Sequence, residues 1–137
     1  MIRDERRARL NDLLVACKSS AEDYEQAAEL AESPALADFF RATAEYRWTL
    51  ADGLAARVRD LHDLPREPDP DRQLLDHALT RLRAVLHLAG DRDLAGERRD
   101  DDRELLEIAR STQDMDLPRP ARDLVRGLAE HVRATLE

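Results

Sequence analysis

The sequence predicts a single all-α domain built as an antiparallel bundle of four helices. Hydrophobic residues make up 42% of the chain, and they recur at the steps of three and four residues that are typical of amphipathic helices. Charged residues make up 38%, and only four glycines are present, which is a composition typical of a globular helical chain. A length of 137 residues corresponds to one domain, so we treat residues 1–137 as a single unit.

The first half of the chain predicts a hairpin of two long helices. From residue 4 to about residue 31, apolar side chains follow alternating steps of four and three, as on the buried face of a bundle helix. Ser33 and Pro34 then supply a cap and a first-turn proline. A second apolar stripe over residues 36–61 predicts the second helix.

A proline-rich segment follows this hairpin. Residues 62–71 contain three prolines, which oppose helix and favour extended polyproline geometry. At about 3.1 Å per residue this segment reaches about 31 Å, comparable with about 27 Å for the helix expected after it. The segment can therefore cross the whole bundle. The second and third helices would then be parallel, as in bundles with one long crossover.

The second half of the chain predicts three more helices. One spans about residues 72–89 and ends at Gly90, and the next spans about residues 92–114. A break at residues 117–120, Leu-Pro-Arg-Pro, precedes a short last helix from about residue 121. We expect the last two helices to form one broken arm of the bundle. We expect the helix over residues 72–89 to bury an apolar stripe made of Leu75, Ala78, Leu79, Leu82, Val85, Leu86 and Ala89.

Charge and cysteine content narrow the function classes. Thirty acidic and 22 basic residues give a formal net charge of -8, which opposes attraction to nucleic acid or to an anionic membrane surface. No stretch approaches the roughly 18 apolar residues of a membrane span, and no signal-peptide pattern opens the chain. Cys17 is the only cysteine, and its apolar neighbours predict a buried, unreactive thiol. We therefore expect a cytoplasmic protein that binds neither nucleic acid nor membrane.

The apolar content also bears on assembly. We expect a monomer or a homodimer, because the buried stripes use up most of the large apolar side chains. Those that remain, Phe39, Tyr46 and Trp48, lie at the margin of the second stripe and form the only large patch expected. The identity of any protein partner is left open.

Several charged residues take positions that the spacing assigns to the core. In the helix that begins near residue 92, steps of four and three from Leu94 place Arg98 and Asp101 on the buried face. Arg47 takes such a position in the second helix, and Glu25 lies at the edge of the first stripe. A buried charge persists only if it is paired or bound to metal. These four residues therefore predict a polar layer in the core.

Three interpretations of these charges stay open. Residues 92–103 could be frayed or looped, which would leave the charges in solvent. The charges could instead form a structural arginine–carboxylate layer. They could also hold a hard metal ion through carboxylates alone, without the imidazoles that suit iron. The candidate ligands for such a metal site are Glu22, Glu25, Asp101 and Glu104. We interpret His131, one residue off the last stripe, as an edge histidine rather than a ligand.

A series of short motifs in a fixed order covers almost the whole chain. It opens with residues 10–14, Tyr24 and the pair Ala27–Ala28, continues through positions 36–54 and residues 78–81, and ends with Leu117–Pro118, Arg122 and residues 124–125. In order and spacing these motifs resemble a family of short bacterial ferritin-like four-helix-bundle proteins built on a domain of unknown function. The resemblance implies a bundle related to ferritins. In many members it also implies carboxylates and histidines that hold two iron or manganese ions.

The chain departs from that family at the expected metal ligands. Di-metal bundles use Glu-x-x-His on two helices, because residues three apart on a helix share a face. No Glu-x-x-His occurs here, and Tyr46 and Arg98 stand where the resemblance implies acidic residues. Arg98 could instead supply the positive charge of a metal ion, with Glu25 and Asp101 as partners.

We therefore expect a non-catalytic bundle without a cofactor, with a degenerate metal site, that acts through partners or self-association. One alternative is a di-metal protein of iron or manganese, for metal storage or oxidation. Another is a stress-linked accessory or interaction protein.

Overall fold

A computed structural model describes residues 2–85 and 90–137, and within these ranges it contains five helices and no strand. The helices are α1 (Ile2–Leu30), α2 (Pro34–Asp60), α3 (Pro70–Val85), α4 (Asp91–Gln113) and α5 (Arg119–Leu136). The predicted all-α class is confirmed. None of the helices in the described part of the chain is long and apolar enough to cross a membrane.

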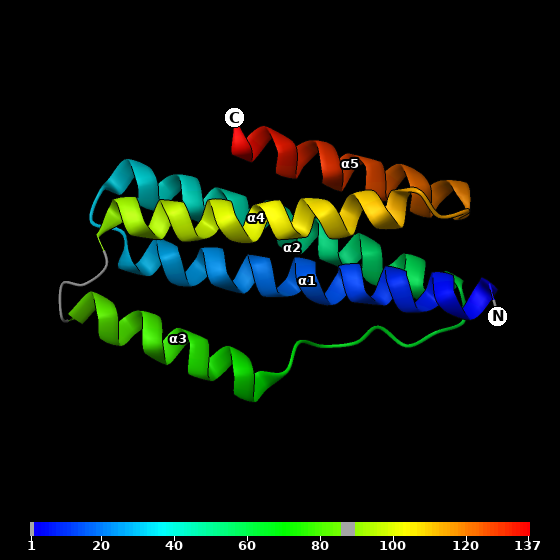
Figure 1. Cartoon of the computed structure of the whole chain (residues 1–137), viewed down its shortest axis with the longest axis horizontal. Helices are drawn as coiled ribbons and strands as arrows, with labels where there is room; N and C mark the ends of the chain where they lie inside the picture. Colours follow the sequence, from blue (N-terminus) through cyan, green and yellow to red (C-terminus); the bar gives the residue numbers. More distant parts are fainter. Residues whose placement is uncertain (1, 86–89) are drawn as a thin grey trace.

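Four of the helices lie side by side along the long axis of the molecule (Figure 1). α1 packs against α2 and α4, and α5 packs against the same two helices. α1 and α2 run in opposite directions, as do α4 and α5, whereas α2 and α4 run in the same direction (Figure 1). α5 ends near the middle of the molecule, so of the four packed helices only α1, α2 and α4 reach one end (Figure 1).

The third helix, α3, runs opposite to α2, so the expected parallel arrangement of the second and third helices is wrong (Figure 1). The proline-rich segment does not cross the bundle by itself, because the long connection between the parallel helices α2 and α4 contains this segment and α3 together. α3 lies outside the four packed helices and rests mainly on α1 (Figure 1). The predicted third stripe is not buried: Leu75 is 60% exposed, Leu79 is 51% exposed and Leu82 is 55% exposed. Ala78 is also exposed. The side chains of Val85, Leu86 and Ala89 lie outside the described part of the chain.

Polar contacts hold α3 in this orientation. Gln73 and His77 of α3 hydrogen-bond to Asp23 of α1, at 3.0 and 3.1 Å. One turn further along, Arg81 pairs with Glu29 at 3.0 Å. The side of α1 that meets α3 is therefore polar. It pairs with the polar face of α3, which explains why the leucines face outward.

The proline-rich segment is extended, as predicted, and α1 anchors it. The side-chain nitrogen of the buried Asn11 donates to the carboxylate of Asp63 and to the carbonyl of Leu64, at 3.2 and 2.9 Å. The side-chain oxygen of Asn11 accepts from the backbone N–H of Arg66 at 2.9 Å. The Asn11 side chain thus supplies hydrogen-bond partners for backbone groups of Leu64 and Arg66, in a segment that forms no helix or strand hydrogen bonds of its own.

The second difference concerns α4 and α5. They do not form one broken arm, because they pack against each other in opposite directions (Figure 1). Leu117 of the connecting turn is buried in the core, and Pro118 takes an extended conformation just before α5 begins. The Leu-Pro-Arg-Pro break therefore reverses the chain.

Hydrogen bonds of Ser33 and His62 mark the start and the end of α2. The Ser33 hydroxyl accepts from the N–H of Leu36, so the predicted cap is confirmed. At the other end, His62 has a φ of 62°, and the N–H groups of His62 and Asp63 donate to Arg59 and Val58. This is the hydrogen-bond pattern of a helix end at which glycine is the usual residue.

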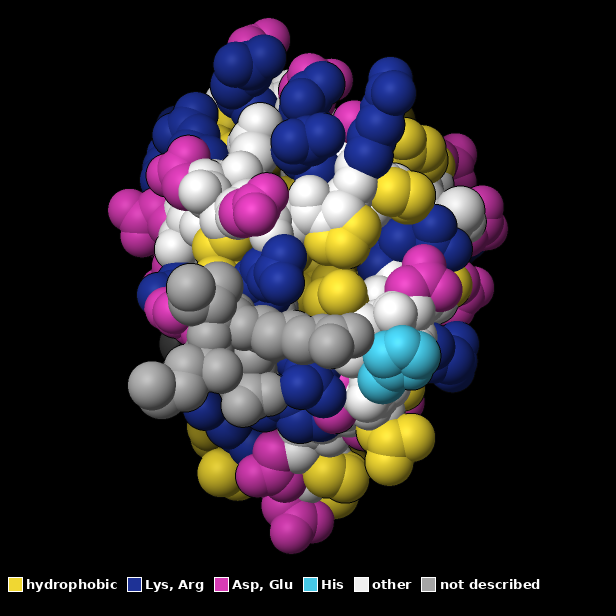
Figure 2. Space-filling model, turned by 90° about the vertical axis from the view of Figure 1, so that its right-hand side faces the viewer, with side chains coloured by type: hydrophobic (Ala, Val, Ile, Leu, Met, Phe, Trp, Pro, Cys, Tyr) yellow, Lys and Arg dark blue, Asp and Glu magenta, His cyan; other side chains and the backbone are white. Residues whose placement is uncertain are grey.

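The core consists of two separate clusters. The larger cluster contains leucines, valines and alanines of α1, α2, α4 and α5, together with Cys17. The smaller cluster contains Tyr24, Phe40 and Leu94 with three alanines, at the end without α5. Figure 2 shows the opposite end of the molecule, where basic and acidic side chains are intermingled around small hydrophobic areas.

The surface patch predicted at the margin of the second stripe is only partly present. Phe39 and Tyr46 are about half exposed, but Trp48 packs against the larger cluster and donates from its indole nitrogen to Glu25. The leucines of α3 form a further exposed apolar area, although their spacing predicts burial.

Candidate functional site

A charged pair lies between the two hydrophobic clusters. Arg47 of α2 has no exposed surface, and Asp102 of α4 is 1% exposed. Their side chains form a two-pronged ion pair, in which Nη1 contacts Oδ1 and Nη2 donates to Oδ2 at 3.0 Å. A bidentate pair of this kind combines charge with fixed geometry, which is what makes burial of an arginine tolerable.

The remaining donors of Arg47 are also used. Nη1 donates to the hydroxyl of Ser20 at 2.6 Å, and Nη2 donates to the hydroxyl of Thr135 at 3.3 Å. Nε donates to Nε2 of His131 at 3.4 Å. A guanidinium has five N–H groups, and each of them has an acceptor here. Arg47 is thus a fully satisfied buried cation.

Two hydroxyl groups lie within hydrogen-bond distance of Oδ2 of Asp102, the oxygen that also accepts from Nη2 of Arg47. The Tyr24 hydroxyl donates to Oδ2 at 2.7 Å, and the Thr135 hydroxyl lies 2.8 Å from the same atom. Burial raises the pKa of the Tyr24 hydroxyl, and the charge of Asp102 raises it further, so Tyr24 stays protonated and continues to donate. The Arg47 guanidinium lies 4.6 Å from the centre of the Tyr24 ring, which adds a cation–π contact.

We call this set of residues the core layer. Its members are Ser20 and Tyr24 of α1, Arg47 of α2, Asp102 of α4, and His131 and Thr135 of α5. All four packed helices contribute. In α1, α2 and α4, the residues of the layer separate residues of the larger cluster from residues of the smaller one.

His131 completes the layer at its edge. It is half-buried, and its Nε2 accepts a hydrogen bond from Arg47, which requires a neutral ring with its proton on Nδ1. Burial and the neighbouring charge of Arg47 lower the pKa of His131 to about 4. The ring centre lies 4.5 Å from that of Tyr46. His131 therefore acts in the layer as a hydrogen-bond acceptor for Arg47.

The structure brings one of the four predicted layer residues into the core. Arg47 is there, and its partner is Asp102, which is not among the four predicted residues. Arg98 and Asp101 do pair, at 2.5 Å, but the Asp101 side chain is 48% exposed. Glu25 is exposed and contacts Trp48 instead.

The error lies in the register of α4. Its buried positions include Leu94, Asp102, Leu105, Ala109 and Thr112, so the stripe passes through residue 102 rather than 101. The adjacent apolar residues Leu105 and Leu106, followed by Ala109, carry the signal for this register, because steps of four and three back from Ala109 reach 105 and 102. The interpretation of residues 92–103 as frayed or looped is wrong, since they lie within α4.

Arg98 lies next to the core layer at the rim of the core, where its side chain is 11% exposed. It is within 3.6 Å of Asp23 as well as 2.5 Å from Asp101, and its guanidinium lies 5.6 Å from the centre of the Tyr24 ring. Burial raises the pKa of Asp101, and Arg98 partly offsets that effect. The pair is therefore a partly solvated counterpart of the core pair.

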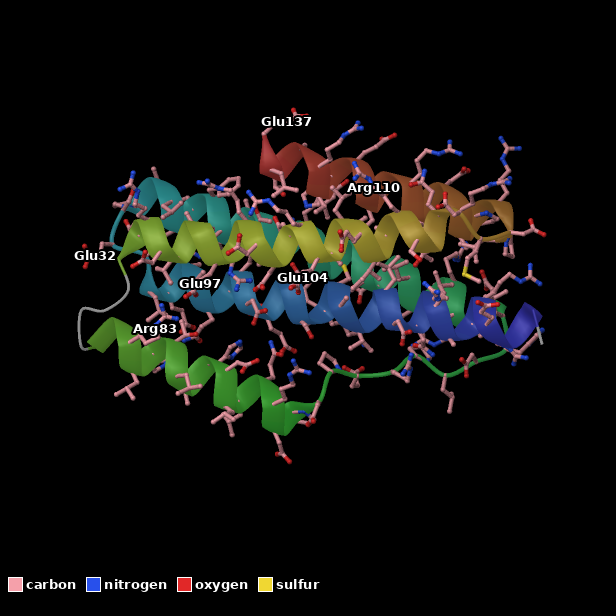
Figure 3. The ribbon with its side chains drawn as sticks, viewed as in Figure 1. Glu32, Arg83, Glu97, Glu104, Arg110 and Glu137 are labelled. Carbon is pink, nitrogen blue, oxygen red and sulfur yellow. The ribbon has the colours of Figure 1, made fainter. Side chains whose placement is uncertain are left out.

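Two of the four candidate metal ligands line a surface cleft. The cleft lies between α1, α3 and α4, has a volume of about 410 Å³, and has Asp101 and Glu104 on its α4 side (Figure 3 labels Glu104). Glu22 and Glu25 do not line it. Burial raises the pKa of Glu22. Over residues 2–85 and 90–137, no three His, Cys, Asp or Glu side chains are grouped so that they could hold a metal ion.

The single cysteine is buried, as predicted. Cys17 has no exposed surface, its thiol donates to the carbonyl oxygen of Arg47 at 3.4 Å, and burial raises its pKa to about 12. A thiol in this state is a poor nucleophile.

Comparisons with protein-family models, with curated proteins and with solved structures gave no match for this chain.

Proposed function

We propose that this chain is a non-catalytic, ferritin-like helical-bundle protein with a degenerate metal site, and that it acts through association. The observation that carries the proposal is Arg47, a cation without exposed surface whose donors all have acceptors within the core layer. A core that contains its own neutralised cation has no need of a metal ion to compensate the carboxylate of Asp102.

The connectivity supports the relation to ferritin-like bundles. α2 and α4 run in the same direction and are joined by a long connection (Figure 1). Ferritin-like bundles have one such crossover, and they hold metal ions between side chains that face each other in the core. The core layer occupies a comparable place, because it also draws side chains from all four packed helices.

The chemistry of the layer favours a structural role over catalysis. A general base needs a free lone pair near a substrate, whereas Nε2 of His131 is occupied by Arg47. Tyr24 is committed to Asp102, and the thiol of Cys17 is protonated and buried. A protein with such a core acts through its surface.

Metal analysis of protein purified without chelators tests the proposal. We expect substoichiometric iron, manganese and zinc, also after incubation with Fe²⁺ or Mn²⁺ and gel filtration. About two ions per chain, as in di-metal bundles, would contradict the proposal and favour the metal-storage or oxidase alternative.

A charge reversal inside the layer sharpens this test. Arg47→Glu removes the internal cation and puts a second carboxylate beside Asp102 and His131, so we expect a less stable protein that Mn²⁺ stabilises. The matched control is Arg98→Glu, which makes the same change at the rim and should give no stabilisation by metal. Equal responses of the two variants would show that the core layer has no relation to a metal site.

A further inference from the structure

The amphipathic character of α3 is inverted with respect to the rest of the molecule. Its least exposed positions are the polar residues Gln73, His77 and Thr80, which face α1 and α4. Its leucines are exposed by half or more. A surface helix normally turns its apolar stripe toward the core, so this stripe is left for a contact outside the chain.

The exposed leucines have the spacing of an association stripe. Leu75, Leu79 and Leu82 are separated by four and three residues, the heptad spacing by which two helices pair. At 100° per residue, these three side chains lie within 60° of one another, on the face opposite to the one that contacts α1. The stripe is therefore continuous along the helix.

The charges beside the stripe are complementary to those of the same helix turned around. Asp76 and Arg83 lie seven residues apart on the flank of the stripe that borders the cleft with α4, where Arg83 pairs with Glu97 at 2.7 Å. Consider an antiparallel pair in which Leu79 packs on Leu82 of a second copy. Asp76 of each copy then lies beside Arg83 of the other copy. Each interface would contain two opposite-charge contacts, related by symmetry.

We propose that α3 is a homodimerisation helix, which pairs with α3 of a second copy in antiparallel orientation through Leu75, Leu79 and Leu82. The partner with which the chain associates is thus a second copy of itself. This inference rests on the function proposed above, in which the chain acts through association. Metal content and self-association are separate measurements, so either proposal can fail without the other.

The size of the contact sets the expected affinity. α3 has 16 residues, and a pair of helices of this length buries an area at the low end for specific interfaces. We therefore expect a reversible dimer with a dissociation constant in the micromolar range. The polar contacts of α3 with α1 stay in place, because the stripe lies on the opposite face. Arg83, which pairs with Glu97 of α4 in the single chain, would share or exchange that contact for Asp76 of the second copy.

Sedimentation equilibrium over about 1 to 500 µM, a range that brackets micromolar association, tests the proposal. The wild type should shift from monomer to dimer, and Leu79→Glu should weaken dimerisation at least about tenfold, since it puts a charge at the centre of the contact. Leu74→Glu is the matched control: Leu74 is 72% exposed, lies on the same helix and is off the stripe, so association should be unchanged. Circular dichroism should show the same helicity for all three proteins.

A charge swap tests the orientation. Asp76→Arg alone should weaken the dimer, because it places like charges together, and the additional change Arg83→Asp should restore the affinity. Arg83 also contacts Glu97 of its own chain at 2.7 Å, so Glu97→Gln serves as control for loss of that internal pair (Figure 3). A wild type that stays monomeric, or a Leu74→Glu variant as impaired as Leu79→Glu, would overturn the proposal. A charge swap that restores nothing would overturn the antiparallel arrangement.

Discussion

Asp101 and Asp102 are neighbours in the sequence, and each of them pairs with an arginine, yet the two pairs have different surroundings. The Asp102–Arg47 pair has a side-chain exposure of 1% and 0%, whereas the Asp101 side chain is 48% exposed and that of Arg98 is 11% exposed. The first pair is enclosed by four helices. The second lies at the edge of a cleft, where water can replace a lost partner.

We expect enclosure rather than residue type to decide what each ion pair contributes to stability. Removing one member of a buried pair leaves an uncompensated charge and costs about 3 to 5 kcal/mol, whereas an exposed pair contributes about 0 to 1 kcal/mol. The adjacent positions in α4 make the comparison a direct one, because both aspartates share the same helix and nearly the same sequence context.

The largest effect is expected for Asp102→Ala. The variant leaves the guanidinium of Arg47 buried without its carboxylate, so the free energy of unfolding should fall by about 3 to 5 kcal/mol. Asp101→Ala is the matched control, for which we expect a loss of about 1 kcal/mol or less. Urea denaturation measures both, and equal losses would contradict the difference in enclosure.

The next effect concerns pH. Because the folded-state pKa of His131 is lowered to about 4 from its ordinary value of 6.5, the unfolded state binds more protons between these values. The contribution of His131 to stability is therefore complete above about pH 6.5 and is lost progressively as the pH falls toward 4. His131→Gln keeps an acceptor for Arg47 and should reduce this dependence, which thermal unfolding from pH 4 to 7.5 can measure. An unchanged pH dependence in the variant would show that His131 does not couple protonation to folding.

The smallest effect is expected for Arg98→Ala. Its partners, Asp23 and Asp101, are 25% and 48% exposed and can be hydrated again. We therefore expect a loss of about 1 kcal/mol or less, and a loss that shrinks further at high salt because exposed charges are screened. Urea denaturation at low and high salt checks this. A salt-independent loss as large as that of Asp102→Ala would place Arg98 in the core.

The spacing along the chain predicts the helices and the burial of Arg47, whereas the charged layer was one of three open interpretations and only Arg47 of its four predicted members lies in the core. Arg47 lies on an apolar stripe, and Leu50 and Leu54, at steps of three and four after it, place it on the buried face of α2. In α4 the stripe is mixed, and Asp101 and Asp102 are chemically identical candidates. The two registers of this stripe differ by one residue, and each places a different aspartate in the core.

The place of α3 could not be predicted from its own stripe. Leu75, Leu79 and Leu82 satisfy every pattern of a buried helix, and their exposure depends on α1, whose polar side meets α3. The partner of Arg47 on α4 and its acceptor on α5 are likewise long-range contacts, which spacing along one helix does not encode.

A double-mutant cycle on Arg47 and Asp102 tests the central claim, that the core contains its own matched cation, most directly. We expect Arg47→Met and Asp102→Leu each to lower the free energy of unfolding by about 3 to 5 kcal/mol, because each leaves one buried charge alone. The double variant should lose far less than the sum of the two, since it removes both charges and replaces them by apolar side chains. Losses that add within about 0.5 kcal/mol would show that the two residues act independently and would contradict the account.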